Sequence, residues 1–198
     1  MTLRLLLGTR NAGKVAELRA LLKGLDVELR SVADLGDPPP DPPEDAPTYA
    51  ENAIFKARAY ARATGLATIA DDSGLEVDAL GGGPGVRSRR YFGDDLPPAE
   101  RNRMLLALLD GVTDRTARFV AVIALAQPDG RVETFDGEVR GEIAESPRGE
   151  DGFGYDPVFI VAEDGRTMAE LPKAEKNAIS HRGLAAAKLR AALAGDSA

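Results

Sequence analysis

The residue types best suited to chemistry lie where a short apolar run, Thr68–Ala70, meets Asp71-Asp72-Ser73-Gly74. A strand alternates its side chains between two faces, so one aspartate at its end can point into a cleft while the other faces away. Gly74 then allows a turn or the close approach of a ligand. We expect the strand to end at this pair, with one aspartate in a chemical role. The alternative is that both only terminate the strand and cap a turn.

A phosphate-binding loop is predicted from the sequence Gly8-Thr9-Arg10-Asn11-Ala12-Gly13-Lys14. The apolar run Leu3–Leu7 before it predicts a buried strand, and a helix is expected from about Lys14 to Lys23, with Gly24 as its stop. Unpaired backbone N–H groups and the positive end of the helix dipole converge at such a loop. The alternative is an ordinary strand-to-helix turn, in which Asn11 and Gly13 serve only the backbone.

The spacing of Gly8, Gly13 and Lys14 also fits most of the P-loop pattern of nucleoside triphosphatases. In a P-loop a Ser or Thr follows the lysine, and its hydroxyl holds magnesium; here Val15 follows. The match therefore fails at its metal ligand. A P-loop-like ATPase or kinase stays as one alternative function, and a nucleotide-binding module without turnover stays as another.

The composition limits the classes of protein that this chain can belong to. Its 198 residues are 43% hydrophobic and 29% charged, which suits one well-buried core, folded as one body or as two lobes. The net charge of -7 argues against a protein that coats nucleic acid or an anionic membrane. The absence of cysteine excludes disulfides and cysteine metal sites. Without a signal-peptide pattern or a long apolar stretch, we expect a cytoplasmic location.

A proline-rich, acidic segment, Asp34–Pro47, precedes a well-marked helix. Its prolines exclude a central strand, so the segment is expected to be an exposed active-site arm or a linker. Thr48 begins a capping box, and the helix after it should stop at Gly65. On this helix Asn52 and Lys56 continue a polar row from Thr48, which we expect to face solvent. The alternative is that Lys56 points at a phosphate.

The carboxyl-terminal part offers a second group of candidates. In Gly152-Phe153-Gly154-Tyr155-Asp156-Pro157 a rigid turn holds a ring on which a base can stack, or else a plug that closes the core. Polar residues then gather before a last helix, expected from about Ser180 to Leu193. The single histidine, His181, is a poor basis for a metal site and suits a hydrogen-bonding role at the helix start. These residues are Lys173, Lys176, Ser180, His181 and Arg182.

The remaining segments are interpreted mainly as architecture. A helix is expected over Pro97–Leu109, and two strands, Phe119–Ala126 and Arg131–Val139, are expected to form a hairpin. The glycine-rich loop Gly81–Gly85 is followed by Ser88–Tyr91. The arginines of Ser88–Tyr91 suit a phosphate or a base, or alternatively a surface or subunit contact.

Five segments of the chain, taken together, closely resemble the inosine/xanthosine triphosphate pyrophosphatase family, also called Ham1-like. They occur in the family's order and at similar spacing, and they cover nearly the whole chain. One departure is Arg89, where the family usually has alanine. The five segments are Thr9-x-Asn11-x-x-Lys14, Glu51-Asn52-Ala53 with Lys56, Ala70–Gly74, Gly152–Pro157 and Ser180-His181-Arg182-Gly183.

The resemblance implies a single domain over residues 1–198 with an elongated, two-lobed α/β fold. A central mixed sheet would be flanked by helices, with a cleft between the lobes, and the protein would form a homodimer. The implied reaction is the hydrolysis of ITP, dITP and XTP to the nucleoside monophosphate and pyrophosphate, with Mg²⁺. The partner is thus a small-molecule purine nucleoside triphosphate, and neither nucleic acid nor a membrane is expected.

The resemblance also implies site residues. It places the triphosphate on the loop of Thr9, Arg10, Asn11, Ala12, Gly13 and Lys14, with Lys56 as a catalytic lysine near the phosphates. It makes Asp72 the proton acceptor and a metal ligand, Ser73 a substrate contact, and Glu44, beside Asp45, the second metal carboxylate. It assigns the base pocket to Phe153, Gly154, Tyr155, Asp156, Lys176, His181 and Arg182.

Overall fold

The computed structural model describes residues 3–93, 96–161 and 165–195, in which strands and helices alternate along much of the chain. The strands are β1 (Leu3–Leu7), β2 (Val27–Ser31), β3 (Ala67–Val77), β4 (Thr116–Ala126), β5 (Val132–Ile143) and β6 (Phe159–Val161). The helices are α1 (Ala12–Leu21), α2 (Tyr49–Thr64), α3 (Pro98–Leu108), α4 (Lys173–Ile179) and α5 (His181–Gly195).

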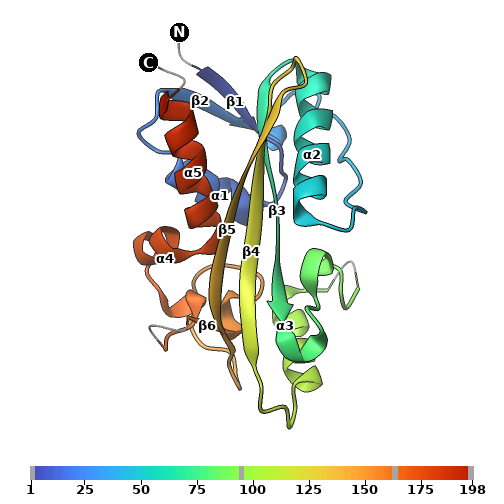
Figure 1. Ribbon diagram of the computed structural model, residues 1–198, viewed down its shortest axis with the longest axis vertical. Coiled ribbons are helices and arrows are strands. Elements are labelled where there is room, and N and C mark those ends of the chain that lie inside the picture. Colours follow the sequence, from blue (N-terminus) through green and yellow to red (C-terminus); the bar gives the residue numbers. More distant parts are fainter. Residues whose placement is uncertain (1–2, 94–95, 162–164, 196–198) are drawn as a thin grey trace. The chain divides into compact units, whose positions relative to one another are not determined.

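The strands form one mixed sheet in the order β2-β1-β3-β4-β5-β6 (Figure 1). Strand β1 pairs in parallel with β2 and β3, whereas β5 and β6 pair antiparallel. The short turn between β4 and β5 allows only an antiparallel hairpin, as expected. The predicted α/β class, with a mixed sheet and flanking helices, is confirmed.

The chain divides into two compact units. Unit 1 comprises Met1–Asp72, Ala121–Gly137 and Arg182–Ala198, and unit 2 comprises Ser73–Val120 and Glu138–His181. Strands β3, β4 and β5 each contribute residues to both units. The border in β3 falls directly between Asp72 and Ser73.

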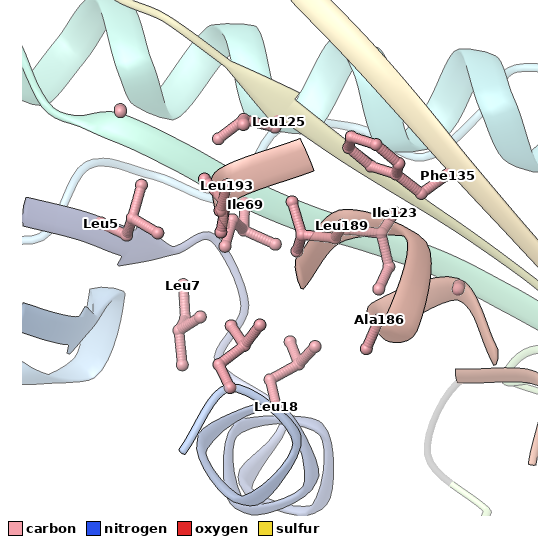
Figure 2. Close-up of a cluster of buried hydrophobic side chains, with 13 residues drawn as sticks. Leu5, Leu7, Leu18, Ile69, Ile123, Leu125, Phe135, Ala186, Leu189 and Leu193 are labelled. Atoms are coloured by element: carbon pink, nitrogen blue, oxygen red, sulfur yellow. The ribbon is translucent and has the colours of Figure 1, made fainter. Parts of the chain in front are cut away.

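In unit 1 the strand residues alternate between two buried faces, as the continuous apolar run of β1 predicts. Leu5 and Leu7 lie in one core cluster with Leu18 of α1 and Leu189 of α5 (Figure 2). Leu6 belongs to a different cluster, which includes Tyr60 of α2. Helices α1 and α5 therefore cover one face of these strands, and α2 covers the other (Figure 1).

The expected strand over Leu3–Leu7 and the helix that follows Thr48 are confirmed. The Thr48 side chain accepts a hydrogen bond from the Glu51 N–H, and Gly65 ends α2 in the left-handed conformation at φ +68°. Helix α1 begins and ends two residues earlier than expected, because the side chain of Asn11 caps it by accepting from the Lys14 N–H. The loop before α1 is correspondingly shorter.

The expectation that a strand ends at Asp71 and Asp72 is wrong. Strand β3 continues to Val77, because Leu75 and Val77 are buried in the core of unit 2, near the packed rings of Phe119 and Phe159. The two aspartates thus lie in the middle of a strand. A charged side chain buried in the middle of a strand requires a partner of opposite charge elsewhere in the chain. Because the local sequence does not show that partner, it indicates the end of a strand.

Three elements were not predicted. Strand β2 has only five residues, although Val27 and Leu29 alternate with polar residues and pack against the core, and β6 has only three residues. Helix α4 is short and polar, and only Lys176 in it is buried. Strand β5 also extends to Ile143, beyond the predicted end at Val139. In the described part of the chain, no helix combines the length and apolar character required to cross a membrane.

Gly8, at the end of β1, provides a test of the packing between β1, β3 and α2. A Cβ added there would lie 2.9 Å from Tyr60 Cδ2 and 3.1 Å from Thr68 Cγ2. We predict that Gly8→Ala lowers the free energy of unfolding by about 1–3 kcal/mol, measured by urea denaturation. Gly36→Ala is the matched control, because a Cβ at Gly36 would meet nothing within 4 Å. Equal unfolding midpoints for the two variants would contradict the prediction.

Candidate active site

The predicted site residues fall into two sets, one in each unit. We call them the phosphate set, in unit 1, and the base set, in unit 2. The phosphate set contains Thr9, Arg10, Asn11, Ala12, Gly13, Lys14, Glu44, Lys56, Asp72 and Arg182. The base set contains Ser73, Phe153, Gly154, Tyr155, Asp156, Lys176 and His181.

The loop between β1 and α1 is held by one hydrogen bond to β3 and by hydrogen bonds within the loop. The Gly8 N–H donates to the Ile69 carbonyl at 2.7 Å, which ties the loop to β3. The Thr9 hydroxyl accepts from the Asn11 N–H at 3.2 Å, and the Asn11 side chain accepts from the Lys14 N–H at 3.2 Å. The first N–H groups of a helix have no intrahelical acceptor. This loop and helix start therefore have the backbone of an anion site.

Two lysines converge on the backbone carbonyl of Asp71. Lys14 Nζ lies 3.4 Å from this oxygen, and Lys56 Nζ lies 3.1 Å from it. Burial lowers the pKa of the Lys14 ammonium; the charge of Asp71 opposes this shift, whereas the charges of Lys56 and Arg182 add to it. Three cations thus lie close together here, and each of them forms an ion pair with a carboxylate.

The Asp71 carboxylate is fully buried, and it compensates the charges of Lys14 and Arg182. Its Oδ2 accepts hydrogen bonds from Arg182 Nε at 3.0 Å and Nη2 at 2.9 Å, and Lys14 Nζ lies 3.3 Å away. Arg182 Nη1 also donates to Glu17 Oε2 at 2.6 Å. Burial alone raises the pKa of a carboxyl, but the charges of Lys14 and Arg182 hold the pKa of Asp71 well below its ordinary value. Asp71 is therefore a permanent charge and a poor proton acceptor.

Asp72, the next residue, points to the opposite face of β3, where α2 lies. Its Oδ2 accepts a hydrogen bond from Asn52 Nδ2 at 3.0 Å. Burial raises the pKa of Asp72 and the charge of Glu44 raises it further, against the opposing charges of Lys14 and Lys56. A carboxylate with a raised pKa is better suited to accept a proton near neutral pH. The pKa of Asp71 is thus lowered, whereas the pKa of Asp72 is raised.

The expectation that Asn52 and Lys56 face solvent is wrong. The two residues are only 2% and 6% exposed. The reason is the arm, which we define as residues 37–47, since it covers this side of α2. Asn52 exchanges two hydrogen bonds with the backbone of Ala46, and Lys56 forms an ion pair with Glu44. The alternative, that Lys56 points at a phosphate, stays a prediction.

The arm is also attached further towards its start, at Asp41. Arg10 Nε donates to Asp41 Oδ1 at 2.8 Å and Arg10 Nη2 donates to the Pro39 carbonyl at 2.7 Å. The Tyr60 hydroxyl of α2 also donates to Asp41. The arm has no helix or strand of its own, so these side-chain contacts determine its path.

Glu44 and Asp72 are the residues of the phosphate set best suited to hold a metal. No cluster of three or more histidine or acidic side chains with metal-binding geometry occurs within the described ranges. Mg²⁺, however, uses only one or two protein carboxylates and takes its other ligands from water and phosphates. The charge of Glu44 raises the pKa of Asp72, so the two carboxylates are close enough to repel each other. A divalent cation would relieve that repulsion, and the pair therefore fits Mg²⁺.

In unit 2, the base set is organised around the carboxylate of Asp156. Asp156 Oδ2 accepts from the Phe153 N–H at 2.7 Å and from Lys176 Nζ at 2.6 Å. Gly152 has φ +80°, and a Cβ there would lie 2.2 Å from Asp156 Oδ2, so only glycine fits. Lys176 Nζ also lies 5.2 Å from the centre of the Phe153 ring. The loop thus presents a buried ammonium beside a partly exposed aromatic ring.

The two rings of this loop have different roles. Tyr155 is buried in the core of unit 2 and donates its hydroxyl hydrogen bond to the Ser88 carbonyl at 2.9 Å. Burial raises the pKa of Tyr155 to about 12. The plug interpretation therefore describes Tyr155, whereas stacking of a base on the partly exposed Phe153 ring stays a prediction.

Asn102 of α3 supports the loop and was not predicted. Its Nδ2 donates to the Gly154 carbonyl at 3.1 Å. The sequence does contain a signal for it, because Asn102 shares a helix face with the buried Leu105 and Leu109. Glu17 was also missed, although it lies one helical turn after Lys14.

His181 and Arg182 are adjacent but belong to different units. The His181 imidazole stacks on the Phe119 ring, with 4.7 Å between centroids and 12° between planes. His181 is the first residue of α5, as expected from its position in the sequence. Arg182 instead contacts Asp71 and Glu17, so its assignment to the base pocket stays a prediction.

Comparison with known proteins gives matches over nearly the whole chain. Residues 5–192 match the model of the Ham1 family. The dITP/XTP pyrophosphatase of Geobacter sulfurreducens is 51% identical over 189 residues, which cover 94% of each chain. The dITP/XTP pyrophosphatase of Symbiobacterium thermophilum is 51% identical over 188 residues, which cover 93% of this chain and 92% of that protein.

Two solved structures have the same fold. The HAM1 protein of Coxiella burnetii has a TM-score of 0.88 and 43% identity, covering 98% of this chain and 99% of that chain. The Ham1 protein of Staphylococcus aureus has a TM-score of 0.87 and 41% identity, with the same coverage.

The Asp71–Arg182 pair leads to a prediction about stability. Arg182→Met leaves a buried carboxylate without its main partner, so we expect it to lower the free energy of unfolding by about 3–5 kcal/mol at neutral pH. Lys188→Met on the same helix is the control. It breaks an exposed ion pair with Asp136, and we expect it to cost at most about 1 kcal/mol. Urea denaturation of both variants measures the difference.

The same pair predicts a pH dependence. The pKa of Asp71 is lower in the folded than in the unfolded protein, so its stabilising contribution is present above about pH 4 and is lost as the pH falls further. In Arg182→Met the pKa of Asp71 should rise. We therefore expect the stability gap to wild type to narrow from pH 7 towards about pH 4. A gap that stays constant over this range would contradict the assignment.

Proposed function

The chain belongs to the Ham1 family, and on this basis we propose that it is a nucleoside triphosphate pyrophosphatase acting on ITP, dITP and XTP. Water cleaves the bond between the α- and β-phosphates, and the products are the nucleoside monophosphate and pyrophosphate. The observation that carries the proposal is the pair of aspartates on β3. One is a permanent counter-charge for three cations, and the other is a carboxylate with a raised pKa.

The phosphate set supplies the electrostatics for a triphosphate. The loop of Thr9–Lys14 and the start of α1 offer backbone N–H groups, and Lys14 and Lys56 add two positive charges beside Asp71. Phosphoryl transfer depends mainly on such charge neutralisation and on the position of the nucleophile. Arg10, at the edge of the loop, adds another cation.

Asp72 is the proposed proton acceptor. Its raised pKa and the hydrogen bond from Asn52 suit a carboxylate that orients a water molecule and takes its proton. Glu44 and Asp72 would hold Mg²⁺, which when bound neutralises phosphate charge and lowers the pKa of water. Lys56 forms an ion pair with Glu44 and donates to the Asp71 carbonyl, and its charge lowers the pKa of Asp72.

The base set supplies the selectivity. Phe153 offers a ring for stacking, and Lys176 and His181 are donors for the 6-oxo group of hypoxanthine or xanthine. Adenine would turn its amino group towards these donors, and each mispaired buried group costs about 1–3 kcal/mol. Guanine shares the 6-oxo group, so its exclusion must depend on the 2-position. Ser73 is proposed as a further substrate contact, and Arg182 as a contact with the base.

The resemblance to the family also leads us to propose a homodimer in the cytoplasm. The net charge of -7 supports the proposal that neither nucleic acid nor an anionic membrane is a partner.

The product assay is the direct test of the function. Purified protein with MgCl₂ should release pyrophosphate and the monophosphate from dITP, ITP and XTP, and ATP and GTP should stay nearly intact. EDTA should abolish turnover. Pyrophosphate and orthophosphate are measured separately. Orthophosphate released from ATP would indicate the P-loop alternative, and binding of dITP without turnover would indicate a binding module.

Asp72→Asn tests the proposed proton acceptor. We expect kcat for dITP to fall by about 10²–10⁴-fold, the usual contribution of a positioned base, while calorimetry shows that dITP still binds. The control Asp136→Asn makes the same change at an exposed carboxylate that pairs with Lys188, and it should retain wild-type kcat. If Asp72→Asn keeps more than about a tenth of the wild-type kcat, Asp72 is not the base.

A further inference from the structure

Asn52 of α2 uses its side-chain amide on two different parts of unit 1. Its Oδ1 accepts a hydrogen bond from the Ala46 N–H at 3.0 Å. Its Nδ2 donates to the Ala46 carbonyl at 3.3 Å and to Asp72 Oδ2 at 3.0 Å. A primary amide has two N–H donors and a carbonyl acceptor, so both donors and the acceptor have a partner here. Asn52 is also almost completely buried.

This arrangement is not required by the helix. Asparagine is a mediocre helix former, and Asn52 is separate from the cap of α2, which Thr48 and Glu51 provide. A buried amide with fully satisfied hydrogen bonds specifies one arrangement of the groups that it joins. The groups joined here are the arm and the carboxylate of Asp72.

The arm depends on side-chain attachments because of its composition. Residues 37–47 include six prolines, which have no backbone N–H, and they form no helix or strand. Arg10 and Tyr60 hold the arm at Asp41, and Asn52 holds it at Ala46. Glu44 lies in the chain between these two attachments. Its position therefore depends on both.

We propose that Asn52 is a positioning residue that fixes the position of the arm, and with it that of Glu44, relative to the Asp72 carboxylate. The inference rests on the proposed function, in which Glu44 and Asp72 act together. Because one amide nitrogen reaches both Ala46 and Asp72, a displacement of the arm breaks or bends the bond that orients Asp72. Asn52 itself need not touch the substrate.

Two variants remove different numbers of these hydrogen bonds. Asn52→Ala removes all three hydrogen bonds. Asn52→Asp keeps an oxygen that can accept from the Ala46 N–H but loses both donors and brings a second carboxylate next to Asp72. Glu51→Gln is the matched control on the adjacent, exposed position, where glutamine preserves the capping box with Thr48.

The first measurement uses the metal-free protein and does not depend on activity. Hydrogen exchange of peptides from the arm, followed by mass spectrometry, should be about tenfold faster in Asn52→Ala than in wild type. Asn52→Asp should show a smaller increase. Peptides from α1 and α5 should keep wild-type protection in every variant, and so should the arm in Glu51→Gln.

The second measurement is dITP hydrolysis with Mg²⁺. We expect kcat to fall about 10–100-fold in both Asn52→Ala and Asn52→Asp, with KM changed much less, because the phosphate loop is untouched. Glu51→Gln should retain the wild-type kcat and KM.

The outcomes distinguish the inference from the proposed function. Unchanged arm exchange in Asn52→Ala, or a kcat within about twofold of wild type, overturns the inference while the proposed function stands. A loss of kcat that accompanies an equal loss of protection in α1 and α5 shows a merely structural role and also overturns it. A wild-type protein that releases no pyrophosphate overturns the proposed function, and with it the catalytic part of the inference.

Discussion

The buried ion pair between Asp71 and Arg182 is the interaction on which unit 1 depends. It joins the middle of β3 to the start of α5, 111 residues later, and Glu17 extends it to α1. A buried pair of this kind contributes little net stability, since desolvation offsets most of the attraction, but the loss of one partner is costly. The pair therefore specifies how two helices meet one strand, while leucines such as Leu189 supply the apolar burial.

The same pair explains how three cations can share one buried place. Lys14, Lys56 and Arg182 would repel one another without the charge and the carbonyl of Asp71. The pKa of Lys14 is nevertheless lowered, mainly by burial, and the charges of Lys56 and Arg182 add to that shift. Burial of the Lys14 ammonium thus costs part of the stability of the folded protein, and an anionic ligand bound beside Lys14 would offset that cost.

The sequence predicted most where local rules decide the structure. The apolar run of β1 and the two caps of α2 required no knowledge of the rest of the chain. The predictions failed where a polar residue has a distant partner. The local sequence around Asp71 indicated the end of a strand, because its partner Arg182 is distant in the sequence. Asn52 was expected to be exposed, because no residue pattern in the arm predicts that the arm packs on α2. The site residues were found through the resemblance to a family, and their contacts came only from the structure.

The arm shows how a segment without regular structure can be placed. Its prolines reduce the number of conformations of the unfolded chain, so fewer contacts are needed to fix it on folding. The same prolines remove backbone donors, and the arm cannot extend the edge of the sheet. Attachment by the side chains of Arg10, Tyr60 and Asn52 follows from these two constraints. Glu44 thus reaches Lys56 on a segment that is stiff but held at few points, which suits a carboxylate whose position must be exact and whose surroundings must admit a substrate.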